Sequence, residues 1–182
     1  MAHAIIEHAQ RELPGAGSEV QPIGGVNEPM QLLVKTEADF AGRERWLLLT
    51  AYDDLMDDTD ETRIVQIFYR FPAEAPAPAD RGDFARLLVA VNNVITIGQF
   101  CYREEDALLY FRALVMLPAA PDSWTTLLND HLSLAAFQID QFGLAIESSA
   151  IGAQTVQAAI AADPRRIGQA EHLLQAHRQR RL

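Results

Sequence analysis

The sequence has one cysteine, no long apolar run and little positive charge. Because Cys101 has no second cysteine to pair with, an internal disulfide is excluded, and a reducing compartment such as the cytoplasm is the simplest expectation. No stretch has the length and uniform apolar character of a membrane-spanning helix. Residues 1–13 lack the basic start and apolar run of a signal peptide. We therefore expect no association with a membrane.

The scarce positive charge is concentrated at one end of the chain. Residues 1–163 carry 10 Lys and Arg against 24 Asp and Glu, a net charge of −14. Residues 164–182 carry five arginines against one glutamate: Arg165, Arg166, Arg178, Arg180 and Arg181. The acidic body repels phosphates and favours basic protein partners. The arginines could contact nucleic acid or an acidic partner, or they could pack onto the acidic body of their own chain.

Apolar periodicity predicts a compact series of helices and strands in the second half of the chain. Asp83 is a suitable N-cap for a helix over residues 82–95, and Gly98 permits a sharp turn after it. The elements expected after this turn are a strand over 100–102, a polar turn at 104–106, a strand over 108–117, and helices over 120–150, 154–162 and from Asp163 onward.

The first half of the chain predicts a short helix over residues 2–13 and a Gly/Pro-rich loop over 14–29. Strands are expected over 31–37, 45–52 and 63–71, and a loop over 72–81. Short connections favour an α+β fold with a mainly antiparallel sheet of about five strands packed with helices. The expected organisation is a short helix and flexible lead-in (1–29), an α+β domain (30–152) and a helical extension with a basic end (153–182).

The predicted strands are apolar at both alternating positions. Residues 46–49 are contiguously apolar, and residues 64–71 and 108–117 place large apolar side chains on both faces. A sheet with helices on one face and water on the other alternates apolar and polar residues. Since an exposed apolar face promotes aggregation, both faces should be covered. We expect a homodimer that buries the second face, the alternative being cover from the extension after Gly152.

No pattern in the sequence predicts a catalytic or metal centre. The aspartate-rich residues 53–61 could hold Ca²⁺ or Mg²⁺, but they lack the EF-hand pattern and are expected to form a solvated turn. The five histidines form no zinc-ligand set. Cys101 lies in a predicted strand with no histidine near it in the sequence, which favours a buried, inert thiol. We therefore expect no enzyme activity, no cofactor and no metal.

A resemblance to a known family rests on the central helix and hairpin. Asn92 and Asn93, Gly98, Phe100, Tyr102, and the run Leu108, Tyr110 and Arg112 resemble the YbjN family, whose fold is similar to that of type III secretion chaperones. The resemblance covers residues 30–150. It implies a small, acidic, dimeric protein that binds other proteins without catalysis, and it supplies no catalytic residues.

The leading hypothesis is a non-enzymatic chaperone or adaptor that acts as a homodimer and holds a client segment on its sheet and helix surface. The residues expected near that surface are Trp46, Phe100, Tyr102, Tyr110 and Arg112. The client could be a basic or a DNA-handling protein. The alternative is a nucleic-acid-linked regulator that binds a DNA-handling protein or contacts DNA through the C-terminal arginines, although direct binding to nucleic acid is expected to be weak or absent. A hydrolase has no supporting constellation of residues.

Overall fold

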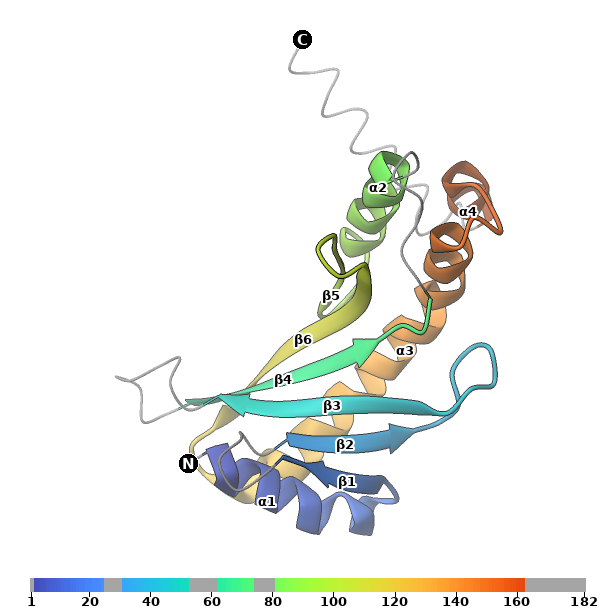
Figure 1. Cartoon of the computed structure of the whole chain (residues 1–182). Helices are drawn as coiled ribbons and strands as arrows, with labels where there is room; N and C mark the ends of the chain where they lie inside the picture. The colour runs from blue at the N-terminus through green and yellow to red at the C-terminus, as the bar shows by residue number, and fades with distance from the viewer. Residues whose placement is uncertain (1, 25–30, 53–61, 74–80, 163–182) are drawn as a thin grey trace. The chain divides into compact units, whose positions relative to one another are not determined.

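The computed structural model has an α+β fold and describes residues 2–24, 31–52, 62–73 and 81–162 (Figure 1). The helices are α1 (Ala2–Glu12), α2 (Arg81–Asn92), α3 (Trp124–Ala150) and α4 (Val156–Ala162), with short 3₁₀ turns at Pro14–Ala16 and Pro121–Ser123. The strands are β1 (Glu19–Ile23), β2 (Gln31–Thr36), β3 (Arg45–Tyr52), β4 (Thr62–Arg70), β5 (Gln99–Arg103) and β6 (Leu108–Pro118). The predicted fold class is confirmed. The C-terminal helix predicted from Asp163 lies outside the described residues.

The strands form one six-stranded sheet in the order β1-β2-β3-β4-β6-β5. The pairs β1–β2, β2–β3 and β3–β4 are antiparallel, as their short connections predict. Their register places Leu33 opposite Leu48 and Leu48 opposite Phe68. Residues that stand directly opposite each other on neighbouring strands therefore share one face of the sheet.

The edge strand β1 was not predicted, and the loop expected over residues 14–29 is wrong at Glu19–Ile23. Pro22 and the neighbouring glycines favour a loop in isolation. Pairing with β2 overrides that preference, for example at Val20 opposite Val34. Proline is tolerated because β1 lies at the end of the strand order, where only one side of a strand must complete a ladder.

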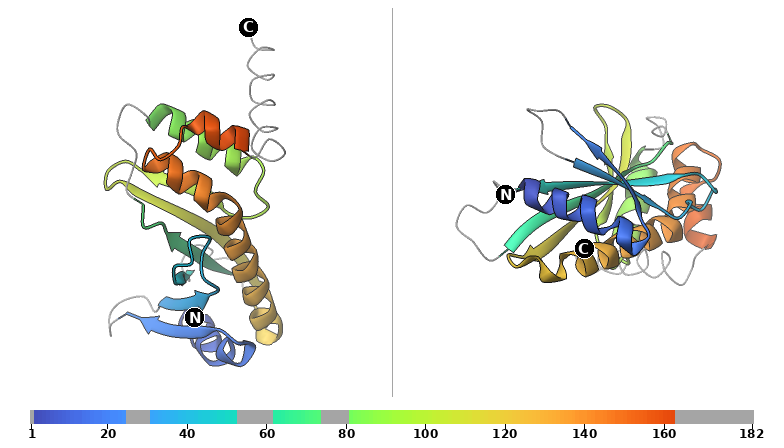
Figure 2. Two further views of the ribbon diagram at one scale, coloured as in Figure 1. Left: turned by 90° about the vertical axis from the view of Figure 1, so that its right-hand side faces the viewer. Right: turned by 90° about the horizontal axis from the view of Figure 1, so that it is seen from below.

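The chain divides into two compact units, and β6 and α3 each contribute residues to both. The first unit consists of residues 1–69 and 112–139. In it, α1 packs against β2 and β3 (Figure 2). Ile5, Ile6 and Ala9 of α1 are buried, and so is Leu13 just after it. The ring of His8 on α1 lies 2.9 Å from the Thr125 hydroxyl and edge-on to Trp124, which ties α1 to the start of α3.

The second unit consists of residues 70–111 and 140–182. Its described core contains a cluster of aromatic side chains. Phe100 packs against Phe71, Phe111 and Phe142 with ring centroids 5.9, 5.1 and 6.3 Å apart. The Asn92 side chain holds the end of α2 to β5, because it donates to the Phe100 carbonyl and accepts from the Phe100 amide, both at 2.8 Å. Asn92, the last residue of α2, therefore also fixes the following strand.

Candidate protein-binding surface

Burial alternates along most of β2, β3, β4 and β6 in the first unit; Thr50, between the buried Leu49 and Ala51, is an exception because it is buried as well. Leu47 and Leu49 of β3 are fully buried, whereas their neighbours Trp46 and Leu48 are only half-buried. In β6, alternate residues from Ala113 to Leu117 are buried, and Leu114 and Met116 between them are 62% and 61% exposed. The buried positions face the helices, so the other positions form an apolar face that the described helices of this unit leave open.

We call this surface the open sheet face. Its apolar members come from five strands: Ile23, Leu33, Trp46, Leu48, Tyr52, Ile64, Phe68, Leu114 and Met116. Directly opposed side chains on neighbouring strands lie in contact range, so the rows Leu33–Leu48–Phe68 and Tyr52–Ile64 are continuous. Strand β6, which carries Leu114 and Met116, neighbours β4 in the sheet. The result is an apolar surface built from neighbouring strands rather than a set of scattered exposed residues.

A short polar row crosses the open sheet face. Thr50 lies opposite Gln31 on one side and Gln66 on the other. The Gln31 Nε2 donates to the Thr50 hydroxyl at 3.0 Å, so this part of the row is satisfied within the chain. A surface with satisfied polar groups can be desolvated by a partner without leaving an unpaired donor or acceptor.

Charge lies at the margins of the open sheet face. The Lys35 Nζ lies 2.7 Å from Glu44, 3.2 Å from Glu19 and 5.5 Å from the centroid of the Trp46 ring. Hydrogen bonds with Glu44 and Glu19 raise the pKa of Lys35, and Lys35 in turn lowers the pKa of Glu44. This cation is therefore neutralised within its own chain. Arg112 is exposed on β6 beside the apolar residues.

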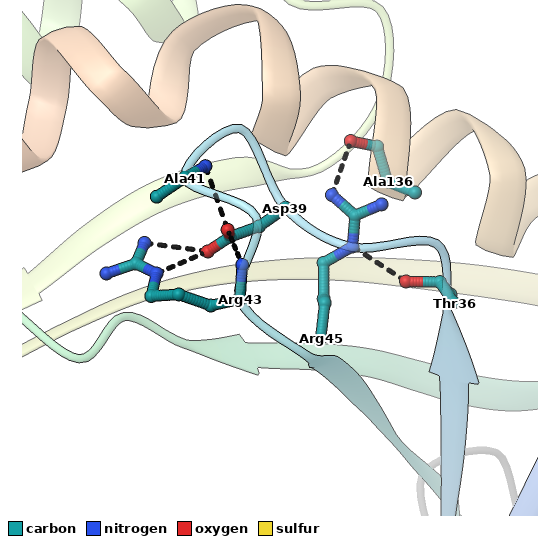
Figure 3. Close-up of polar contacts among 6 residues, drawn as sticks. All are labelled: Thr36, Asp39, Ala41, Arg43, Arg45 and Ala136. Atoms are coloured by element: carbon teal, nitrogen blue, oxygen red, sulfur yellow. Dashed lines mark hydrogen bonds and ion pairs between the residues drawn. The ribbon is translucent and has the colours of Figure 1, made fainter.

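A buried polar network fixes which face of the sheet meets α3 (Figure 3). Arg45 is 1% exposed; its Nε donates to the Thr36 hydroxyl at 2.7 Å, and its Nη1 donates to the Ala136 carbonyl of α3 at 3.3 Å. In the preceding turn, Asp39 accepts hydrogen bonds from the amides of Ala41 and Arg43. A slip of one residue would turn Arg45 away from α3, so the network opposes any register that reverses the two faces.

The residues predicted for a partner surface fall in both units. Trp46 and Arg112 belong to the first unit and lie on the open sheet face. Phe100, Tyr102 and Tyr110 belong to the second unit. There, Phe100 is 1% exposed within the aromatic core, Tyr110 is half-buried, and the Tyr102 ring packs edge-on against Phe84 at 6.0 Å. Their part in partner binding stays a prediction.

Residue-level reasoning missed several members of the open sheet face, Leu48, Phe68, Leu114 and Met116 among them. The signal was present in the sequence, because these residues make the strands apolar at both alternating positions. That pattern predicted a covered second face. The other predicted sites lie outside the described residues: the aspartate-rich segment 53–61 and the arginines Arg165, Arg166, Arg178, Arg180 and Arg181.

The described part of the chain holds neither a cluster of metal ligands nor a membrane-spanning helix. Within it, no three His, Cys, Asp or Glu side chains gather as ligands for a metal ion. Among the same residues, every helix is too short or too polar to cross a membrane. Comparison of the chain with protein-family models and with curated protein sequences gives no match. The resemblance to the YbjN family therefore stays a prediction.

Proposed function

We propose that the chain is a non-enzymatic protein-binding module, a chaperone or adaptor that acts as a homodimer through the open sheet face. The observation that supports this proposal is the apolar surface over β1–β4 and β6, which one polar row crosses and which has its charges at the margins. Proteins rarely leave such a surface in water, since it drives association. The resemblance to the YbjN family agrees with binding without catalysis.

A second copy of the chain suits the open sheet face as its main occupant. The same surface on two subunits makes an isologous contact that closes at two copies. Lys35 is already paired with Glu19 and Glu44 of its own chain. An isologous contact therefore does not bury an unpaired lysine charge on either subunit. A standard interface buries roughly 800 Å² per partner. At about 25 cal/mol per Å² of buried apolar area, the free energy gained by burying such an interface exceeds the cost of association, which is roughly 4–15 kcal/mol.

Substitutions at the most exposed members test the dimer without threatening the fold. Leu114→Glu and Met116→Glu replace side chains that are 62% and 61% exposed in the single chain. We expect light scattering to give a dimer for the unaltered protein and a monomer for each variant. Val89→Glu is the matched control, because Val89 is 50% exposed on α2 in the second unit, and it should stay dimeric. A monomeric unaltered protein would exclude the dimer.

Client binding is tested by capture from native extract with the full-length protein as bait. We expect retained proteins whose binding survives nuclease treatment. Binding that nuclease abolishes would instead support the nucleic-acid-linked regulator, the alternative that the C-terminal arginines suggest. Retention by the unaltered protein but not by Leu114→Glu would show that client binding needs the open sheet face.

A further inference from the structure

Helix α3 carries a second exposed apolar surface in the first unit. Its buried side holds Leu128, Leu132, Ala135 and Ile139. On its opposite side, Leu134 is 39% and Phe137 is 51% exposed. Together with Asp130 and Ser133 they line a hollow of about 510 Å³. We call these four residues the outer α3 surface, which is separate from the open sheet face because it lies on a helix rather than on the strands.

The spacing of the outer α3 surface suits a helical partner. Positions 130, 133, 134 and 137 follow the i, i+3, i+4, i+7 pattern, so they form one stripe over two turns. Such a stripe accepts the ridge of another amphipathic helix. An extended strand would gain little there, because strand addition depends on main-chain hydrogen bonds that the interior of a helix has already used.

The charge of α3 indicates the sign of that partner. The helix has no lysine or arginine in its 27 residues, while Asp130 within the stripe is exposed. Asp122, just before the helix, is exposed as well. A partner helix with lysine or arginine beside its apolar side chains would therefore meet complementary charge, whereas an acidic helix would be repelled.

We propose that the outer α3 surface binds a basic amphipathic helix of a client protein. The inference rests on the proposed function, since it assigns the client to α3 and leaves the open sheet face to the second copy. Two helical turns bury less area than a standard interface, so the affinity of this surface alone belongs to the weak, micromolar class. A client bound this way is exchanged readily.

The test uses a synthetic peptide of about 20 residues, a length at which an isolated helix becomes viable in water. It carries leucine at i, i+3, i+4 and i+7 and lysine at its charged positions. A matched peptide has glutamate in place of each lysine. We expect fluorescence anisotropy to show binding of the lysine peptide only. Phe137→Ser and Asp130→Lys should each weaken that binding about tenfold, whereas Val89→Ser, an exposed apolar change on α2, should not.

Three results would overturn the inference: no binding of the lysine peptide, equal binding of both peptides, or unchanged binding by Phe137→Ser. Light scattering on the same samples separates this inference from the proposed dimer. Leu114→Glu should abolish the dimer and still bind the lysine peptide, while Phe137→Ser should stay dimeric. A dimer without peptide binding defeats only the client site, and a monomer whose peptide binding depends on Phe137 defeats only the dimer.

Discussion

At the scale of single residues, Asp39 couples stability to pH. Its carboxylate accepts hydrogen bonds from the amides of Ala41 and Arg43 at 2.9 Å, and from the Arg43 side chain at 2.7 Å. Burial by itself raises the pKa of Asp39, but the bonds from Arg43 and Ala41 outweigh it and hold the pKa below the ordinary 3.8. Its stabilising effect is therefore fully present above pH 3.8 and is lost as the pH falls through the lower folded-state pKa.

We expect Asp39→Asn to lower the free energy of unfolding by about 2 kcal/mol at neutral pH, because charged hydrogen bonds to a buried group are lost. The deficit relative to the unaltered protein should shrink in acid, where Asp39 itself becomes neutral. Urea unfolding at neutral pH and below the ordinary pKa measures both values. Asp83→Asn is the control, since the pair between Asp83 and Arg86 is exposed and should contribute little. A deficit that is constant with pH would contradict this account.

At the scale of elements, Arg45 joins the β2–β3 hairpin to α3. The guanidinium is buried and donates to the Thr36 hydroxyl and the Ala136 carbonyl, so its removal deprives both acceptors of this donor. We expect Arg45→Ala to cost about 3 kcal/mol in unfolding free energy, and Arg45→Met to cost less because its apolar chain fills the space. Chemical denaturation measures both. Arg86→Ala, at an exposed site on α2, should cost under about 1 kcal/mol. Equal stability of Arg45→Ala and Arg86→Ala would show that the network does not hold the hairpin.

The elements also show what the sequence can predict. Strand β3 was predicted at its observed bounds, residues 45–52, and the long helix over 120–150 was found with only its first turn differing, because both have long apolar patterns. Strand β1 was missed because its pairing with β2 is a tertiary effect that no local signal carries. Because the strands are apolar at both alternating positions, the sequence predicted an apolar second face. It could not predict which residues lie on that face, because alternation assigns residues to faces only once the side covered by helices is known.

At the scale of the whole molecule, the two proposed contacts should respond differently to salt. The open sheet face is apolar and pairs Lys35 internally, so dimer stability should change little with ionic strength. The outer α3 surface would attract a basic helix through Asp130 and the net charge of −10, so its association rate should fall as salt rises.

Stopped-flow association of the lysine peptide at low salt and at physiological salt measures that rate, and sedimentation in the same buffers measures the dimer. A peptide association rate that is independent of salt would remove charge steering from the account, whatever the strength of binding.

Lys35 gives amine-directed reagents one specific side chain to modify. It is the sole lysine in the sequence, and it stands at the margin of the open sheet face between Glu19 and Glu44. Only the neutral amine attacks an acylating reagent, and the raised pKa of Lys35 makes that neutral form scarcer. Apart from the terminal amino group, this molecule therefore offers an acylating enzyme or an amine-directed dye one slow target, whose modification would remove the cation that holds both carboxylates at the edge of the proposed interface.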